Sequence, residues 1–117
     1  MGAMEEDAAR SLRVLFVTAP PADAPTLGRT LVEERLVACA NVLPGATSFY
    51  WWQGALCRDE EAVLWMETTA GRLEAATARL REIHPYEVPK IVAFTPAAVH
   101  GPYAAWVHAE TSPRDAT

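Results

Sequence analysis

The residues with the clearest chemical potential stand in the stretch EIHPYEVPKIVAF, Glu82 to Phe94. A histidine, His84, comes directly before the first of two prolines, and an acid, Glu87, follows three residues later. Imidazole is the commonest metal ligand among side chains, but a helix C-terminus also favours a histidine through its dipole. The stretch therefore fits either a ligand site or a proline-stiffened joint between a helix and a strand, and the residues alone leave both open.

The other reactive side chains give weaker signals. Cys39 stands in an apolar run, where a free cysteine usually behaves as a small buried hydrophobe. Together with Cys57 it makes neither a CxxC pair nor a disulfide framework. The acidic run 59–61 can collect cations, although such runs are more often solvated loop tips. Since there is no nucleophile elbow, phosphate-cradling glycine loop or two-histidine motif, and no spacing rule for a Cys39–His84 pair, we expect no enzymatic activity.

Composition narrows the range of partners. The 117 residues carry a net charge of -5 with a single lysine, which argues against a nucleic-acid partner and favours cations. No apolar run approaches the roughly 18 to 20 residues of a membrane span, and no secretion signal opens the chain. With half of the residues hydrophobic, a single domain with its own core is expected. We therefore expect a cytoplasmic protein that does not enter a membrane.

The first half of the chain predicts a strand, a helix and a second strand. Residues Leu12 to Thr18 are rich in β-branched side chains and end in a proline-rich loop. Asp23 can cap a helix that runs to about Leu36 with apolar residues at a period of about 3.6. A strand over Cys39 to Leu43 is then closed by Pro44-Gly45.

The second half predicts a hairpin followed by a helix, a strand and a last helix. We expect the hairpin to span 38–69, with a loop over Gly54 to Glu60 at its tip. Thr69 is a plausible cap for a helix over Arg72 to His84, which a strand over 90–94 follows. Pro102 can start a final short helix.

This order predicts an α+β, ferredoxin-like fold, βαββαβ plus a C-terminal helix, with an antiparallel sheet and a long protruding hairpin. The domain is expected to cover residues 11–111, with segments 1–10 and 112–117 outside it. Two helices on one face of the sheet leave the other face uncovered, and its apolar residues would form a patch that soluble monomers rarely keep. Self-association through the hairpins, closed into a ring, is the expected solution.

Several motifs, taken together, resemble the CutA family of divalent-cation tolerance proteins. The resemblance covers Val14 to Val107. Its markers are VTAP at 17–20, Cys39 and Asn41, PGATSFYWWQG at 44–54, DEE at 59–61, TT at 68–69, HPYEVP at 84–89, Tyr103 and Trp106. No single marker is specific, but their combination is. What the resemblance implies is a homotrimer assembled like the PII signalling proteins, without an established catalytic activity.

The resemblance also implies a response to divalent cations, with copper as the first candidate. Some relatives have a further cysteine and a further histidine where this chain has Val17 and Ile83. Copper(II) favours imidazole and oxygen donors and copper(I) favours thiolate. The implied metal ligands are His84, Glu87, Cys39 and Tyr86. A site with one histidine would need ligands pooled from three subunits.

Contacts between subunits are expected along the hairpin and around the HPYEVP stretch. The residues expected in clefts or interfaces between subunits are Asn41, Ser48, Tyr50, Trp52, Glu61, Glu67, Lys90 and Trp106. Glu67 and Lys90 exchange charge sign together relative to the family's usual residues, so we expect these two side chains to approach each other, within a chain or across a subunit boundary.

The sequence therefore predicts a cytoplasmic homotrimer that binds or responds to divalent metal ions, most of all copper. A second hypothesis is a PII-like signalling or scaffold trimer that binds a small anionic ligand or a partner protein in its clefts, through cations such as Lys90 and Arg72. A third is a stable structural trimer whose metal uptake is incidental.

Overall fold

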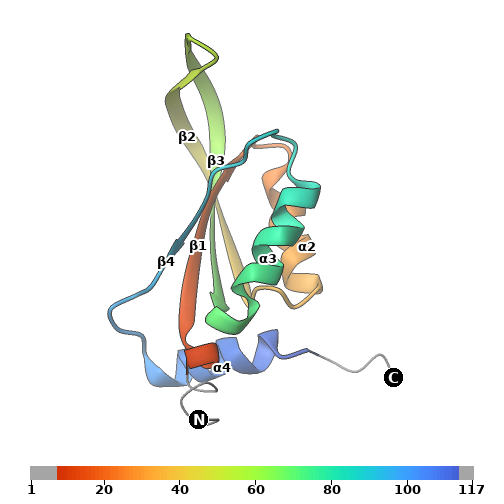
Figure 1. Ribbon diagram of the computed structural model, residues 1–117, viewed down its shortest axis with the longest axis vertical. Helices are drawn as coiled ribbons and strands as arrows, with labels where there is room; N and C mark the ends of the chain where they lie inside the picture. The colour runs from red at the N-terminus through yellow and green to blue at the C-terminus, as the bar shows by residue number, and fades with distance from the viewer. Residues whose placement is uncertain (1–7, 114–117) are drawn as a thin grey trace.

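A long two-stranded hairpin dominates the structure, a computed structural model in which residues 8–113 are described (Figure 1). The elements in chain order are β1 (Leu12–Ala19), α2 (Ala24–Glu33), β2 (Cys39–Trp52), β3 (Ala55–Thr69), α3 (Ala70–Ile83), β4 (Ile91–Phe94) and α4 (Gly101–Thr111). The strands form one antiparallel sheet in the order β2-β3-β1-β4. This confirms the predicted ferredoxin-like fold with an added C-terminal helix.

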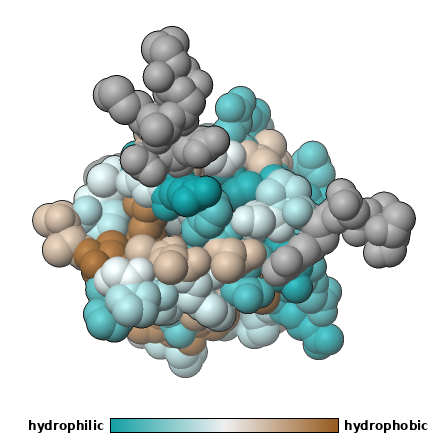
Figure 2. Space-filling model, turned by 90° about the horizontal axis from the view of Figure 1, so that it is seen from below, coloured by the Kyte–Doolittle hydropathy of each residue, from teal (hydrophilic) through white to brown (hydrophobic). Residues whose placement is uncertain are grey.

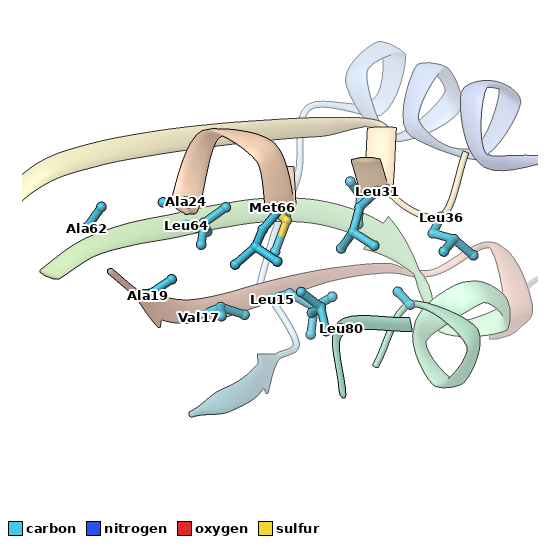
Figure 3. Packing of buried hydrophobic residues seen from close by; sticks show 13 residues of the cluster. Leu15, Val17, Ala19, Ala24, Leu31, Leu36, Ala62, Leu64, Met66 and Leu80 are labelled. Carbon is cyan, nitrogen blue, oxygen red and sulfur yellow. The ribbon is translucent and has the colours of Figure 1, made fainter. Parts of the chain in front are cut away.

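The main core lies between the sheet and helices α2 and α3, which cover one of its faces (Figure 3). Alternate residues of the two central strands point toward these helices, because successive side chains of a strand face opposite sides. Leu15 and Val17 of β1 and Leu64 and Met66 of β3 are fully buried there. The helices contribute residues of their apolar sides, among them Leu27, Leu31, Ala76 and Leu80.

Helix α4 covers only one end of the opposite face. Val107 packs there in a second, smaller cluster with Leu12, Val14 and Ala38. Further along the same face, Trp65 remains 41% exposed. The predicted uncovered face is therefore present in the single chain, shortened by α4 at the end of the sheet opposite the hairpin tip (Figure 1).

The tip of the hairpin corrects the prediction of a loop over Gly54 to Glu60. The strands are joined by a two-residue turn, Gln53 and Gly54, with φ angles of 49° and 80°. Two central residues with positive φ match the type I′ turn, whose twist suits two adjacent antiparallel strands. The acidic run 59–61 consequently lies within β3, not in a loop.

We expected Pro44 and Gly45 to end the strand, but β2 continues through them. The register shifts between Leu43, which pairs with Val63, and Ala46, which pairs with Glu61. Two residues of β2 therefore stand opposite one of β3, which is a β-bulge, and Gly45 has the positive φ of 89° that such bulges often require. The bulge lets β2 continue to Trp52.

The ends of the elements differ modestly from the predicted bounds. Asp23 and Thr69 occupy the N-cap positions of α2 and α3, but neither side chain makes a capping hydrogen bond to a described residue. Helix α2 ends at Glu33, before Arg35, whose backbone is left-handed.

Residues 8–10 are helical, and the amide of Ser11 donates to the carbonyl of Ala8. The remainder of the two predicted flanking segments, 1–7 and 114–117, lies outside the described residues. Within 8–113, no helix has the length and apolar character needed to cross a bilayer.

Candidate functional site

A groove of about 730 Å³ lies where the segment joining α3 to β4 passes the hairpin. In Figure 1 this segment runs beside β1 and β3, below the projecting half of the hairpin. The residues lining the groove are Thr18, Ser48, Phe49, Tyr50, Trp52, Glu61, Pro85, Tyr86, Glu87, Val88 and Lys90. The structure thus brings together five of the residues predicted for subunit clefts (Ser48, Tyr50, Trp52, Glu61 and Lys90) and two of the predicted ligands (Tyr86 and Glu87).

His84 is buried behind the groove, at the C-cap of α3. The following Pro85 disfavours helical geometry at this residue, and His84 has extended backbone angles. Its Nδ1 accepts a hydrogen bond from the amide of Tyr86 (3.1 Å), and its Nε2 lies 2.8 Å from the carbonyl oxygen of Thr18. An acceptor Nδ1 and a carbonyl partner at Nε2 define the Nε2–H tautomer of a neutral ring. Both ring nitrogens are therefore occupied by backbone groups.

Tyr86 connects this joint to a carboxylate of β3. Its hydroxyl donates to Oε2 of Glu61 over 2.8 Å, and its ring centroid lies 4.8 Å from that of His84. Glu61 is only 5% exposed. Burial, together with the hydrogen bond to Glu61 and its negative charge, raises the pKa of the Tyr86 phenol well above its usual range. The floor of the groove is thus a buried carboxylate with a phenol donor held against it.

The hairpin supplies the opposite wall. Tyr50 donates a hydrogen bond to Asp59 on the neighbouring strand, and this bond is the main reason why the pKa of Tyr50 rises to about 12. At the other end, the Nζ of Lys90 lies 5.1 Å from the ring centroid of Phe16, a cation–π distance. The groove therefore offers acidic oxygens on one side and a single ammonium on the other.

A second polar cluster lies on the same face of the sheet but near α4. The hydroxyl of Tyr103 donates to Oε1 of the buried Glu67 over 2.9 Å, and Trp106 stacks on Tyr103 with ring centroids 5.6 Å apart. Cys39 pairs with Glu67 across the strands. Burial and the charge of Glu67 raise the pKa of the Cys39 thiol, which disfavours the reactive thiolate. Asn41 accepts from this thiol at 3.8 Å.

The four predicted metal ligands do not form one site within a chain. Cys39 pairs with Glu67, whereas Tyr86 bonds Glu61, six residues away along β3. Six residues of extended strand span about 20 Å, so the thiol is remote from His84, Tyr86 and Glu87. Among the described residues, no group of three or more histidine, cysteine or acidic side chains has a metal-binding arrangement. A complete ligand set would have to include groups from a neighbouring chain.

The expected approach of Glu67 and Lys90 does not occur within the chain. Glu67 bonds Tyr103 beside β1 residue Val14, while Lys90 lies over Phe16 at the groove. Charge complementarity therefore predicted the wrong partners. Within the chain, Glu67 contacts the phenol of Tyr103 and Lys90 contacts the ring of Phe16. Period-2 alternation along β3 would have indicated that Glu61, Trp65 and Glu67 share a face, but nothing in the sequence singled out Tyr103 and Tyr86 as their donors.

The comparisons of sequence and of structure all identify CutA proteins as similar to this chain. Residues 13–110 match the model of the family described as CutA1 divalent ion tolerance protein. A divalent-cation tolerance protein CutA of Thermus thermophilus is 40% identical over 99 residues, which cover 84% of this chain and 96% of that protein. Mouse protein CutA is 37% identical, over 86% of this chain and 58% of its own length. Among solved structures, CutA of Xylella fastidiosa superposes with a TM-score of 0.84 at 36% identity, covering 87% of this chain and 99% of that one. The PII-like protein CutA of Nostoc sp. gives 0.82 at 33% identity, covering 86% and 97%.

Proposed function

This chain belongs to the CutA1 family of divalent ion tolerance proteins, and on that basis we propose that it is a cytoplasmic homotrimer that binds or responds to divalent cations, copper first, without catalysing a reaction. The proposed site is the groove between the hairpin and the α3–β4 segment, completed by side chains of a neighbouring subunit.

The observation that most supports this proposal is the combination of an acidic groove and an exposed apolar hairpin beside it. Phe49 and Trp51 are 66% and 72% exposed on the projecting half of the hairpin. Large apolar side chains grouped in this way are typical of an interface, where aromatic residues act as anchors. A second chain seated on the hairpin would enclose the groove and bring further ligands to it.

The oxygen atoms of the groove suit a cation. Glu61 is buried and holds its carboxylate at the floor, and the exposed Glu87 lies at the rim. Copper(II) accepts carboxylate and phenol oxygens beside imidazole nitrogen. Because both nitrogens of His84 are occupied, that residue acts in this proposal by positioning Tyr86.

A second candidate function is recognition of a small anion in the same groove. Lys90, the only lysine of the chain, lines it and lies over an aromatic ring. An anionic ligand could pair with this ammonium while its apolar part packs on the hairpin aromatics. This alternative is also consistent with the structural similarity to the protein of Nostoc sp. that is described as PII-like.

Calorimetric titration of metal-free protein with copper(II) tests the metal proposal, alongside sedimentation analysis of the oligomeric state. We expect a trimer with saturable binding that Glu61→Gln and Glu87→Gln both weaken. Glu74→Gln, an exposed acid of α3 away from the groove, is the matched control and should leave binding unchanged. A monomer, or binding that all three variants weaken equally, would contradict the proposal. If the parent protein binds a small anion and Lys90→Gln loses that binding while it keeps copper binding, the result would support the alternative.

A further inference from the structure

A second hollow, of about 390 Å³, lies at the end of the molecule opposite the hairpin tip. It is formed where the helical residues 8–10, the first turn of α3 and the end of α4 meet. Figure 2 views the molecule from this end, where strongly hydrophilic surface adjoins apolar patches. Nothing in the groove described above involves these residues, so the hollow is separate from the proposed cation site.

The lining of this hollow is basic in a protein that is acidic overall. Arg10, Arg72 and His108 contribute nitrogen donors, and none of the described lining residues is an acid. The whole chain has a net charge of -5, so such a grouping is not a consequence of composition. Within residues 8–113, neither arginine forms an ion pair.

Arg72 provides the second, independent observation. Its Nε is shielded from water and has no hydrogen-bond partner in the described part of the chain. A buried polar group without a partner is costly, and native proteins rarely leave one unexplained. The guanidinium edge formed by Nε and one Nη matches two oxygens of a phosphate or carboxylate. The guanidinium of Arg72, which lines the hollow, is therefore held there without a protein acceptor for its Nε among the described residues.

The backbone at the start of α3 also favours an anion in this hollow. Thr69, at the N-cap of the 14-residue helix α3, makes no side-chain capping bond within residues 8–113, and the first-turn residues Gly71 and Arg72 line the hollow. A helix N-terminus presents free N–H groups and a partial positive charge. Of the first-turn amides, that of Ala70 donates to the carbonyl of Ser11, and no bond from those of Gly71 and Arg72 to another described residue is present. Backbone and side-chain donors thus converge on one small space.

We propose that this hollow binds the phosphate or carboxylate group of a small molecule, held by Arg72 with help from Arg10 and His108. Its volume falls near the lower end of the range for small-molecule pockets, about 300–1,000 Å³, which suits a small metabolite. The segment that supplies Arg10 precedes residues 13–110, the region that matches the family model. Ala9 seals one side, because its carbonyl oxygen would lie 3.2 Å from a Cβ added at Gly71.

The test is a calorimetric titration of the full, metal-free chain with inorganic phosphate, and separately with succinate, at constant ionic strength. We expect saturable binding of at least one of the two, which identifies the preferred oxyanion. Arg72→Met should weaken it roughly tenfold, the loss of one charge-assisted bidentate contact. Arg72→Lys should restore only part of the affinity, because an ammonium keeps the charge without the fork.

The matched control is Arg81→Gln, which removes the same charge from the exposed end of α3. An equal loss in Arg81→Gln and Arg72→Met would show non-specific attraction and overturn the proposal. So would absence of saturable binding of both anions to the parent protein. Since no divalent metal is present, these results are independent of the cation function. Circular dichroism of each variant confirms the fold, and Arg10→Gln gives a second measurement if Arg72→Met proves unstable.

Discussion

The hydroxyl of Tyr86 donates a 2.8 Å hydrogen bond to Oε2 of Glu61, joining the segment after α3 to the middle of β3. Glu61 is 5% exposed, so its carboxylate has little contact with water and depends on this donor. The bond fixes the position of the HPYE segment over the groove. It thereby links the local route of the chain to the geometry of the proposed site.

Tyr86→Phe should lower the free energy of unfolding by about 1–3 kcal/mol, because it leaves a buried carboxylate without its donor. Urea denaturation measures this loss. The double variant Tyr86→Phe/Glu61→Gln should lose less than the sum of the two single variants, since the residues interact directly. Additive losses would show that the hydrogen bond contributes little to stability.

His84 is predicted to be structural in the single chain, as the neutral Nε2–H tautomer. Nitrogen NMR of the imidazole ring reports the tautomer directly. His84→Ala should lower stability in metal-free protein by about 1–3 kcal/mol for each backbone group left unpaired. A variant as stable as the parent that has lost copper binding would instead identify His84 as a ligand.

Tyr50 should titrate at unusually high pH. The hydrogen bond to Asp59 favours the neutral phenol and raises its pKa to about 12, from about 10 in an unfolded chain. The resulting stability is fully present below pH of about 10 and is lost as the pH rises through about 12. Alkaline titration of the phenolate absorbance, with Tyr50→Phe to assign the signal, measures the shift. Asp59→Asn should bring the pKa back toward 10, and a parent Tyr50 already titrating there would refute the expectation.

The hairpin turn should be sensitive to residue type at both of its positions. Gly54 has a φ of 80°, where a side chain is strained, so Gly54→Ala should cost about 1 kcal/mol of stability. Gln53→Asn should be neutral or stabilising, because asparagine tolerates the left-handed conformation at 49° better. Gly101→Ala is the control, because a Cβ meets no atom within 4 Å at either glycine but Gly101 lacks the positive φ of Gly54. Thermal unfolding compares the three variants, and equal melting temperatures would rule out strain at the turn.

Local patterns predicted the elements well but their junctions less so. Apolar periodicity identified β1 to β4 and α2 to α4, because burial on one side imposes a fixed spacing, but it missed the short helical stretch 8–10. The turn at Gln53 and the bulge at Pro44-Gly45 were misjudged for a common reason. Proline and glycine mark departures from regular backbone, but a strand can absorb such a departure as a bulge when its partner continues.

The ferredoxin-like order of elements, the long hairpin and the family could all be predicted from the amino-acid sequence, since these rest on local spacing and on motifs. Which polar groups meet depends on the three-dimensional packing of the elements. It placed Cys39 beside Glu67, about 20 Å along β3 from Glu61, the partner of Tyr86. It paired Glu67 with Tyr103 and not with Lys90, and it occupied both nitrogens of His84 with backbone groups. It also brought Arg10, Arg72 and His108 around one hollow. Such contacts depend on strand register and helix packing between segments far apart in the chain, which no local pattern encodes.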